Sequence, residues 1–127
     1  MKRILVIDDD PQILNLLTEM LHTDSHEVKT VTNGRLALRL IREQGPWDVI
    51  LCDILMPQQD GIETMLAIRK LGIGQKVVAM TGGGRYLDID QIQTMIRDFG
   101  VPALLRKPFS LAQLLEAIDQ VHAEPIP

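Results

Sequence analysis

Two kinds of hydrophobic pattern alternate along the chain. Short runs of β-forming residues, bounded by turn-forming residues, predict five strands at 4–7, 27–31, 49–53, 76–80 and 103–105. After each run, apolar residues recur every three or four positions, which predicts five helices at about 11–22, 34–44, 62–70, 88–99 and 111–121. The chain therefore repeats a strand followed by a helix.

This order predicts an α/β fold. Helical connections favour parallel pairing through right-handed crossovers, which places helices on both faces of a doubly wound, five-stranded parallel sheet. The uninterrupted apolar runs 4–7 and 49–52 indicate central strands, whereas the more polar run 27–31 is typical of an edge strand. We expect one domain at residues 1–122 and a short tail with two prolines at 123–127.

Each helix is expected to bury an apolar stripe against the sheet. Pro11 is favourable in the first turn of the first helix, and Ser110 is the expected N-cap of the last. The expected stripes of the first, second, third and last helices are Ile13, Leu14, Leu16, Leu17, Met20 and Leu21; Leu36, Ala37, Leu40 and Ile41; Ile62, Met65 and Leu66, with Ile68 as a further candidate; and Leu111, Leu114, Leu115, Ile118 and Val121.

Composition narrows the classes of function. With 127 residues, 46% hydrophobic and 24% charged, the chain has the size and composition of one ordinary globular domain. A net charge of -4 argues against a nucleic-acid surface. The first apolar run is too short for a signal peptide or a membrane span. The single cysteine, Cys52, lies inside a strand, so we expect a buried thiol in a cytoplasmic protein.

Polar residues stand at the ends of four predicted strands. Asp8 and Asp9 follow the first strand, Asp53 ends the third, and Thr81 and Lys107 follow the fourth and fifth. Because parallel strands end at the same edge of a sheet, where open α/β sheets bind ligands, we expect these residues to converge. Singly, each could be a cap or a turn residue, but their coincidence favours a functional site.

The chemistry of these residues indicates phosphoryl transfer. Carboxylates gathered at one edge repel each other unless a cation lies between them, and their oxygen ligands suit Mg²⁺. Lys107 adds a positive charge, and Thr81 adds a hydroxyl with the Gly82 amide behind it; such groups bind a tetrahedral anion. With Asp53 as nucleophile, the product would be an aspartyl phosphate.

These residues lie in motifs that resemble the receiver domain of two-component response regulators, of the chemotaxis-regulator type, over essentially the whole chain. The motifs are Ile-Leu-Val-Ile-Asp-Asp-Asp-Pro at 4–11, Asp-Ile-Leu-Met-Pro at 53–57 with Asp60-Gly61, Thr81-Gly82, and Lys107-Pro108-Phe109. The resemblance implies a flavodoxin-like sheet with strand order 2-1-3-4-5. It also implies a domain that is not an enzyme beyond Mg²⁺-dependent self-phosphorylation from a phosphodonor and autodephosphorylation.

The resemblance assigns a role to each acid. Asp53 would be the phosphoacceptor and a ligand of Mg²⁺, Asp9 would be a direct ligand, and Asp8 would hold the metal largely through water. The main-chain carbonyl of Leu55 would complete the protein's share of the metal shell.

The phosphate-binding and switch residues are assigned in the same way. Lys107 would bind one phosphoryl oxygen and precede a cis peptide to Pro108, and Thr81, with Gly82 behind it, would swing to bind another. The family's usually aromatic switch position is Leu104 here, so an aromatic rotation cannot accompany the threonine movement. The connection Gly82–Tyr86 is glycine-rich; we favour a flexible loop, and a docking segment or an anion contact through Arg85 stays open.

We therefore expect a stand-alone receiver that takes a phosphoryl group from a sensor histidine kinase or a histidine phosphotransfer protein. It would signal through changed binding to a downstream protein, since the chain ends too soon after its last helix for a DNA-binding domain. A non-switching interaction or phosphate-sink module is the alternative, and a phosphatase acting through Asp53 is a weaker one. We expect no nucleic acid or membrane partner and leave a weak homodimer open.

Overall fold

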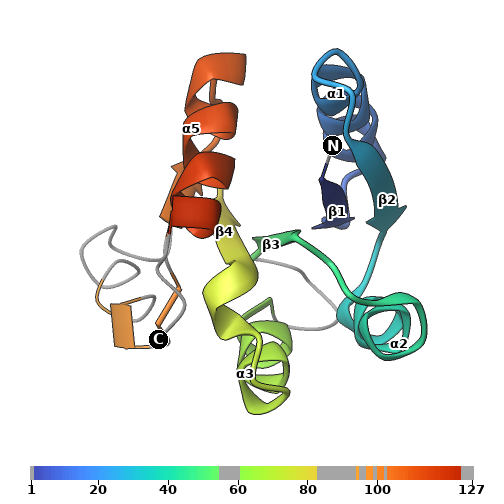
Figure 1. The fold of residues 1–127 in the computed structure, drawn as a ribbon, viewed down its shortest axis with the longest axis vertical. Coiled ribbons are helices and arrows are strands. Elements are labelled where there is room, and N and C mark those ends of the chain that lie inside the picture. The colour runs from blue at the N-terminus through green and yellow to red at the C-terminus, as the bar shows by residue number, and fades with distance from the viewer. Residues whose placement is uncertain are drawn as a thin grey trace.

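The computed structural model describes residues 2–54, 61–82, 94, 97–98, 100–101 and 103–123, and the structural statements below concern these residues. Its sheet has five parallel strands, in the order β2-β1-β3-β4-β5 (Figure 1). They are β1 (Arg3–Ile7), β2 (Glu27–Val31), β3 (Val49–Asp53), β4 (Val77–Thr81) and β5 (Ala103–Arg106). The expected doubly wound α/β fold, its strand order and its edge strand are confirmed.

Helices follow the strands in the expected order. They are α1 (Pro11–His22), α2 (Gly34–Gln44), α3 (Gly61–Lys70), the 3₁₀ turn η1 (Gly74–Lys76) and α5 (Leu111–Ala123). The helix expected at about 88–99 lies largely outside the described residues, of which 94, 97 and 98 are helical. Lys76, which we placed in the fourth strand, belongs to η1 instead. The last helix includes Ala123, the first residue of the expected tail, and the rest of the tail lies outside the described residues.

Short polar residues fix where the helices begin. The Asp10 side chain accepts the N–H of Gln12 at 2.9 Å, just before Pro11 opens α1. At α5 the Ser110 hydroxyl accepts the N–H of Gln113 at 3.1 Å, and the Gln113 side chain accepts the N–H of Ser110 at 2.9 Å. This reciprocal pair is a capping box, which confirms Ser110 as the cap and fixes the direction in which α5 leaves the sheet.

Two hydrophobic layers enclose the sheet. Figure 1 shows α1 and α5 on one side of it and α2 and α3 on the other. Successive strand residues alternate between the layers, so Val49 and Leu51 of β3 pack on the α1 and α5 side, whereas Ile50 and Cys52 pack on the α2 and α3 side. The sheet therefore separates two cores, and each strand contributes to both.

The helices bury narrower stripes than the pattern predicts. Leu14, Leu17 and Leu21 of α1 are buried. Four leucines that we assigned to buried stripes are instead partly open to solvent, with exposed fractions of 50% for Leu16, 44% for Leu36, 36% for Leu66 and 39% for Leu111. Leu16, Leu36 and Leu66 lie to one side of the buried positions of their helices, and Leu111 is the first residue of α5.

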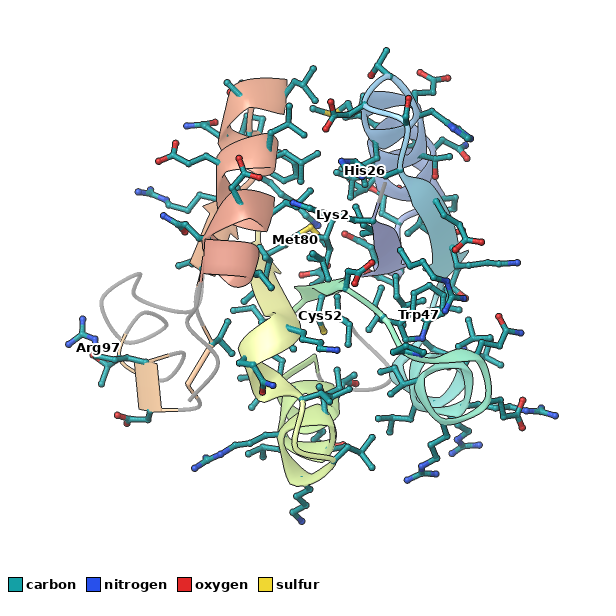
Figure 2. The ribbon with its side chains drawn as sticks, in the orientation of Figure 1. Lys2, His26, Trp47, Cys52, Met80 and Arg97 are labelled. Carbon is teal, nitrogen blue, oxygen red and sulfur yellow. The ribbon has the colours of Figure 1, made fainter. Side chains whose placement is uncertain are left out.

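The amino-terminal edge of the sheet is held by Arg3. Its guanidinium donates to Glu27 at 2.6 Å and to the carbonyl oxygens of Gln44 and Pro46, each at 2.8 Å. It also lies 4.4 Å from the ring centroid of Trp47, a buried residue labelled in Figure 2. These contacts tie β1, β2 and the connection from α2 to β3 together at the edge opposite the acidic residues.

Candidate functional site

Three carboxylates meet at the carboxyl ends of β1 and β3. One oxygen from each of Asp8, Asp9 and Asp53 lies within 4.8 Å of the others. Asp8 is fully buried and Asp53 is 4% exposed, while Asp9 is exposed. The strands deliver the two buried acids, because Asp8 directly follows β1 and Asp53 is the last residue of β3. Two of the three carboxylates are thus shielded from bulk water beside the third.

Lys107 faces the two buried acids. Its Nζ donates to Asp8 Oδ2 at 2.6 Å and to Asp53 Oδ2 at 3.3 Å, and its backbone N–H donates to the carbonyl oxygen of Thr81 at 2.8 Å. Burial by itself would lower the pKa of Lys107, but the hydrogen bond to Asp8 and the charges of Asp53 and Asp8 outweigh it, so the pKa is raised. The Lys107 side chain therefore stays protonated and positively charged at this edge of the sheet.

Thr81 is fully buried, and its hydroxyl has no hydrogen-bond partner among the described residues. It continues the row of Val77 and Ala79, which pack on the α2 and α3 side, whereas Lys107 continues the row of Ala103 and Leu105 on the α1 and α5 side. A buried hydroxyl without a partner is costly to leave unpaired. Such a hydroxyl is available to a ligand that reaches it.

Two features near Asp53 carry structural roles. A Cβ at Gly61 would collide with the carbonyl oxygen of Asp53 and with the backbone of Ile54, so only glycine lets α3 begin this close to the acid. Sequence reasoning used Asp60-Gly61 as part of a motif and missed this contact. Cys52 is fully buried, as expected, and this burial, together with the negative charges of Asp53 and Asp8, raises the pKa of its thiol.

The remaining predicted residues fall in three groups. Gly82 is exposed directly after Thr81, and Leu104 is half-buried and packs against the core on the α2 and α3 side. The peptide between Lys107 and Pro108 is cis, as the resemblance implied. Leu55 and the loop residues after Gly82, Arg85 among them, lie outside the described residues.

The charges of the site match a divalent cation. Asp8, Asp9, Asp53 and Lys107 together bring three carboxylates and one ammonium group to this edge, so carboxylates outnumber the ammonium by two. Carboxylate oxygens are the ligands that Mg²⁺ prefers, and buried acids this close together repel one another without a counter-ion. The residues present therefore fit Mg²⁺.

Similarity to known proteins points the same way. The chain matches the family model of the response regulator receiver domain over residues 4–119. It is 32% identical over 121 residues to the transcriptional regulatory protein CpxR homolog of Haemophilus influenzae, covering 95% of this chain and 50% of that protein. It is 28% identical over 120 residues to the chemotaxis protein CheY of Halobacterium salinarum, covering 94% of this chain and 96% of that protein.

A solved structure is similar as well. The response regulator protein TrrA of Thermotoga maritima, in complex with Mg²⁺-BeF, superposes with a TM-score of 0.79 at 30% identity, covering 95% of this chain and 99% of that one. The chain spans about half the length of the first curated relatives it matches and nearly the whole of CheY. No helix in the described part of the chain is long and apolar enough to cross a membrane. The chain belongs to the response regulator receiver domain family of two-component signal transduction.

Proposed function

We propose that Asp53 is the phosphoacceptor of this receiver domain. The observation that carries the proposal is the buried carboxylate of Asp53 at the end of the central strand β3, with Asp8 and Asp9 within 4.8 Å and Lys107 3.3 Å away. The phosphodonor would be a sensor histidine kinase or a histidine phosphotransfer protein in the cytoplasm. The phosphorylated domain would signal through changed binding to a downstream protein.

The reaction uses Asp53 as nucleophile. Its carboxylate oxygen forms a bond to phosphorus as the bond from phosphorus to the donor's imidazole nitrogen breaks, and the electron pair of that bond returns to the imidazole. Lys107 holds its positive charge where negative charge gathers on the phosphoryl oxygens. Its closer contact with Asp8, at 2.6 Å, keeps the ammonium in place before the phosphoryl group arrives.

Mg²⁺ would be held by Asp8, Asp9, Asp53 and the main-chain carbonyl of Leu55. When bound, the ion supplies positive charge that neutralises the acids and the incoming phosphoryl oxygens. The fit of the three carboxylates supports this assignment, as does the Mg²⁺-BeF complex of the similar protein TrrA.

Thr81 and Gly82 would detect the phosphoryl group. The Thr81 hydroxyl is buried without a partner in the described part of the chain, and a phosphoryl oxygen on Asp53 would give it one. The Gly82 amide would donate a second hydrogen bond. Movement of Thr81 toward Asp53 would then couple phosphorylation to the layer on the α2 and α3 side, which includes Leu104.

The test is to incubate the protein with acetyl phosphate and to measure the phosphoryl adduct by mass spectrometry of the intact protein. Asp53→Asn should abolish the phosphoryl adduct and leave the fold intact, because the amide is nearly isosteric and relieves charge repulsion. Asp9→Ala should remove most of the Mg²⁺ dependence of labelling. Asp48→Asn, which changes a half-buried acid just before the same strand, is the matched control and should label normally. Undiminished labelling of Asp53→Asn would refute the assignment.

A further inference from the structure

Helix α2 carries a line of positive charge on its outer surface, which we name the arginine stripe. Arg35, Arg39 and Arg42 are exposed and spaced at i, i+4 and i+7, so they follow one side of the helix over about 10 Å. They are three of the chain's eight arginines, and Glu43 is the only acid of α2, in a protein with a net charge of -4. Figure 2 shows nitrogen-tipped side chains that project from α2 away from the sheet.

Arg35, at the start of the arginine stripe, works against the stability of α2. Of the three arginines in the stripe, only Arg39 has an ion-pair partner among the described residues. Its partner is Glu43, at 3.3 Å, and both side chains are well exposed. Like charges one turn apart, as in Arg35 with Arg39, destabilise a helix. Arg35 also puts a positive charge in the first turn, where the helix dipole favours an acid and α2 has none. Charges that are unfavourable for the helix itself are expected where a surface serves a function.

The side chains of the stripe border a hollow of about 340 Å³, lined by Arg35, Leu36, Arg39, Arg42 and Glu43. Leu36 is 44% exposed, so the hollow offers an apolar contact beside the guanidinium groups. Guanidinium groups bind carboxylates through paired hydrogen bonds. The exposed leucine has no counterpart in a chain of phosphates but can pack against an apolar side chain, so the lining favours a protein segment over a nucleic acid or a lipid headgroup.

We propose that the arginine stripe is a docking surface for an acidic segment of a partner protein. Charge complementarity identifies the occupant: a helix with glutamates at i, i+4 and i+7 and a neighbouring leucine would match the arginine spacing and cover Leu36. The surface lies on α2, apart from the acids at the ends of β1 and β3, and it does not depend on phosphorylation of Asp53.

The experiment measures binding of a fluorescent helical peptide with that glutamate and leucine pattern to the unphosphorylated protein at low salt. The combined variant Arg35→Gln, Arg39→Gln and Arg42→Gln should weaken binding about tenfold. Added salt should weaken binding to the parent protein, because exposed charges are screened. The matched control removes three exposed positive charges elsewhere, with Lys29→Gln, Arg69→Gln and Lys70→Gln, and should bind nearly as the parent does.

Three further measurements decide the proposal. Leu36→Ser should weaken binding of the leucine-containing peptide, and a peptide with glutamine in place of glutamate should not bind. The single variant Arg35→Gln should melt at the same or a higher temperature than the parent, because it removes a positive charge from the first turn of α2. No binding of the glutamate peptide, an equal loss in the matched control, or tighter binding of duplex DNA or anionic vesicles would each overturn the docking surface.

Discussion

Lys107 is one cation shared by two buried carboxylates. Its Nζ contacts Asp8 at 2.6 Å and Asp53 at 3.3 Å, and both acids are nearly shielded from water. Because the pKa of Lys107 is raised, its ion pairs contribute fully at neutral pH, below the ordinary lysine pKa of about 10.4. That contribution is lost only as the pH rises through the raised pKa. The metal-free site therefore depends on Lys107 for charge balance.

Replacing Lys107 by methionine should destabilise the metal-free protein. The change keeps most of the apolar side chain but leaves Asp8 and Asp53 without their cation, which costs on the order of 3 kcal/mol when a buried pair is broken. Mg²⁺ should restore part of the loss, since under the proposed assignment it would supply positive charge at the same acids. Urea denaturation in EDTA and in Mg²⁺ measures both effects. An unchanged midpoint in EDTA would show that the pair contributes nothing.

Thr81→Val should separate folding from signalling. Valine has nearly the same shape and removes a buried hydroxyl that has no partner in the described part of the chain, so stability should stay the same or rise by about 1 kcal/mol. Thr18→Val is the matched control, because the Thr18 hydroxyl donates to the Leu14 carbonyl at 2.7 Å and its removal should bring no gain. Denaturation measures stability, and fluoroberyllate-induced shifts in amide spectra measure the response. A Thr81→Val protein clearly less stable than the parent would contradict this reading.

Helix α5 begins four residues beyond Lys107, so its cap, Ser110, lies close to the site along the chain. Ser110 and Gln113 satisfy each other's backbone N–H groups. Four N–H groups at the start of any helix lack partners within it, and this pair satisfies one of them while anchoring the residue before the helix. The capping box therefore fixes the start of α5 close to Lys107, which follows β5.

Ser110→Ala should lower the free energy of unfolding by about 1 kcal/mol. Gln113→Ala should cost less, and the double variant should lose less than the sum of the two, because the two hydrogen bonds support each other. A double-mutant cycle by thermal and urea denaturation makes the measurement. Strict additivity would mean that the two residues do not act as a unit.

The sequence predicted the helices well and their buried faces less well. Polar caps and turns mark the ends, as Asp10 and Ser110 do, and these signals act locally. Whether Leu36 is buried depends instead on how α2 lies on the sheet, and here Ala37 faces the core while Leu36 is 44% exposed. An apolar pattern cannot distinguish neighbours at the edge of a stripe, because both fit the same helical period.

At the scale of the whole molecule, the sheet stands between two separate cores. Cys52 lies in one of them, near the centre of the molecule in Figure 2, and is fully buried. Because burial raises the pKa of its thiol, the folded protein keeps the thiol protonated through the pH range in which an unfolded cysteine, with a pKa of about 8.5, ionises. The thiol's contribution to stability is thus complete below that pH and decreases above it.

Cys52 should therefore react with a thiol reagent only when the whole domain unfolds. The labelling rate at neutral pH should follow the free energy of unfolding, and Mg²⁺ should slow it by stabilising the folded state. Gln75→Cys in a Cys52→Ala background gives an exposed reference thiol that should react at once. Fast labelling of Cys52 in the folded protein would mean that its core opens locally.

The sequence predicted which residues meet at the candidate site, but not the contacts between them. Parallel strands bring their ends to one edge, so Asp8, Asp53 and Lys107 could be placed together from the chain order alone. The strand order itself came from the family resemblance, because local patterns do not say which strands are neighbours. The 2.6 Å contact between Lys107 and Asp8, and the need for glycine at 61, depend on side chains and backbones distant in sequence.

Because side chains alternate along the strands, the sheet separates the residues of the acid site into two groups, one on each of its faces. Asp8, Asp53 and Lys107 continue rows that pack beneath α1 and α5, whereas Thr81 and Leu104 belong to rows on the other side. If a phosphoryl group draws the Thr81 hydroxyl toward the acids, that movement would leave space on the α2 and α3 side of the sheet. This space lies diagonally across from Leu104 on the adjacent strand. A leucine can fill such space by changing its rotamer, so the lack of an aromatic ring would alter the shape of the response and leave its route across the sheet intact.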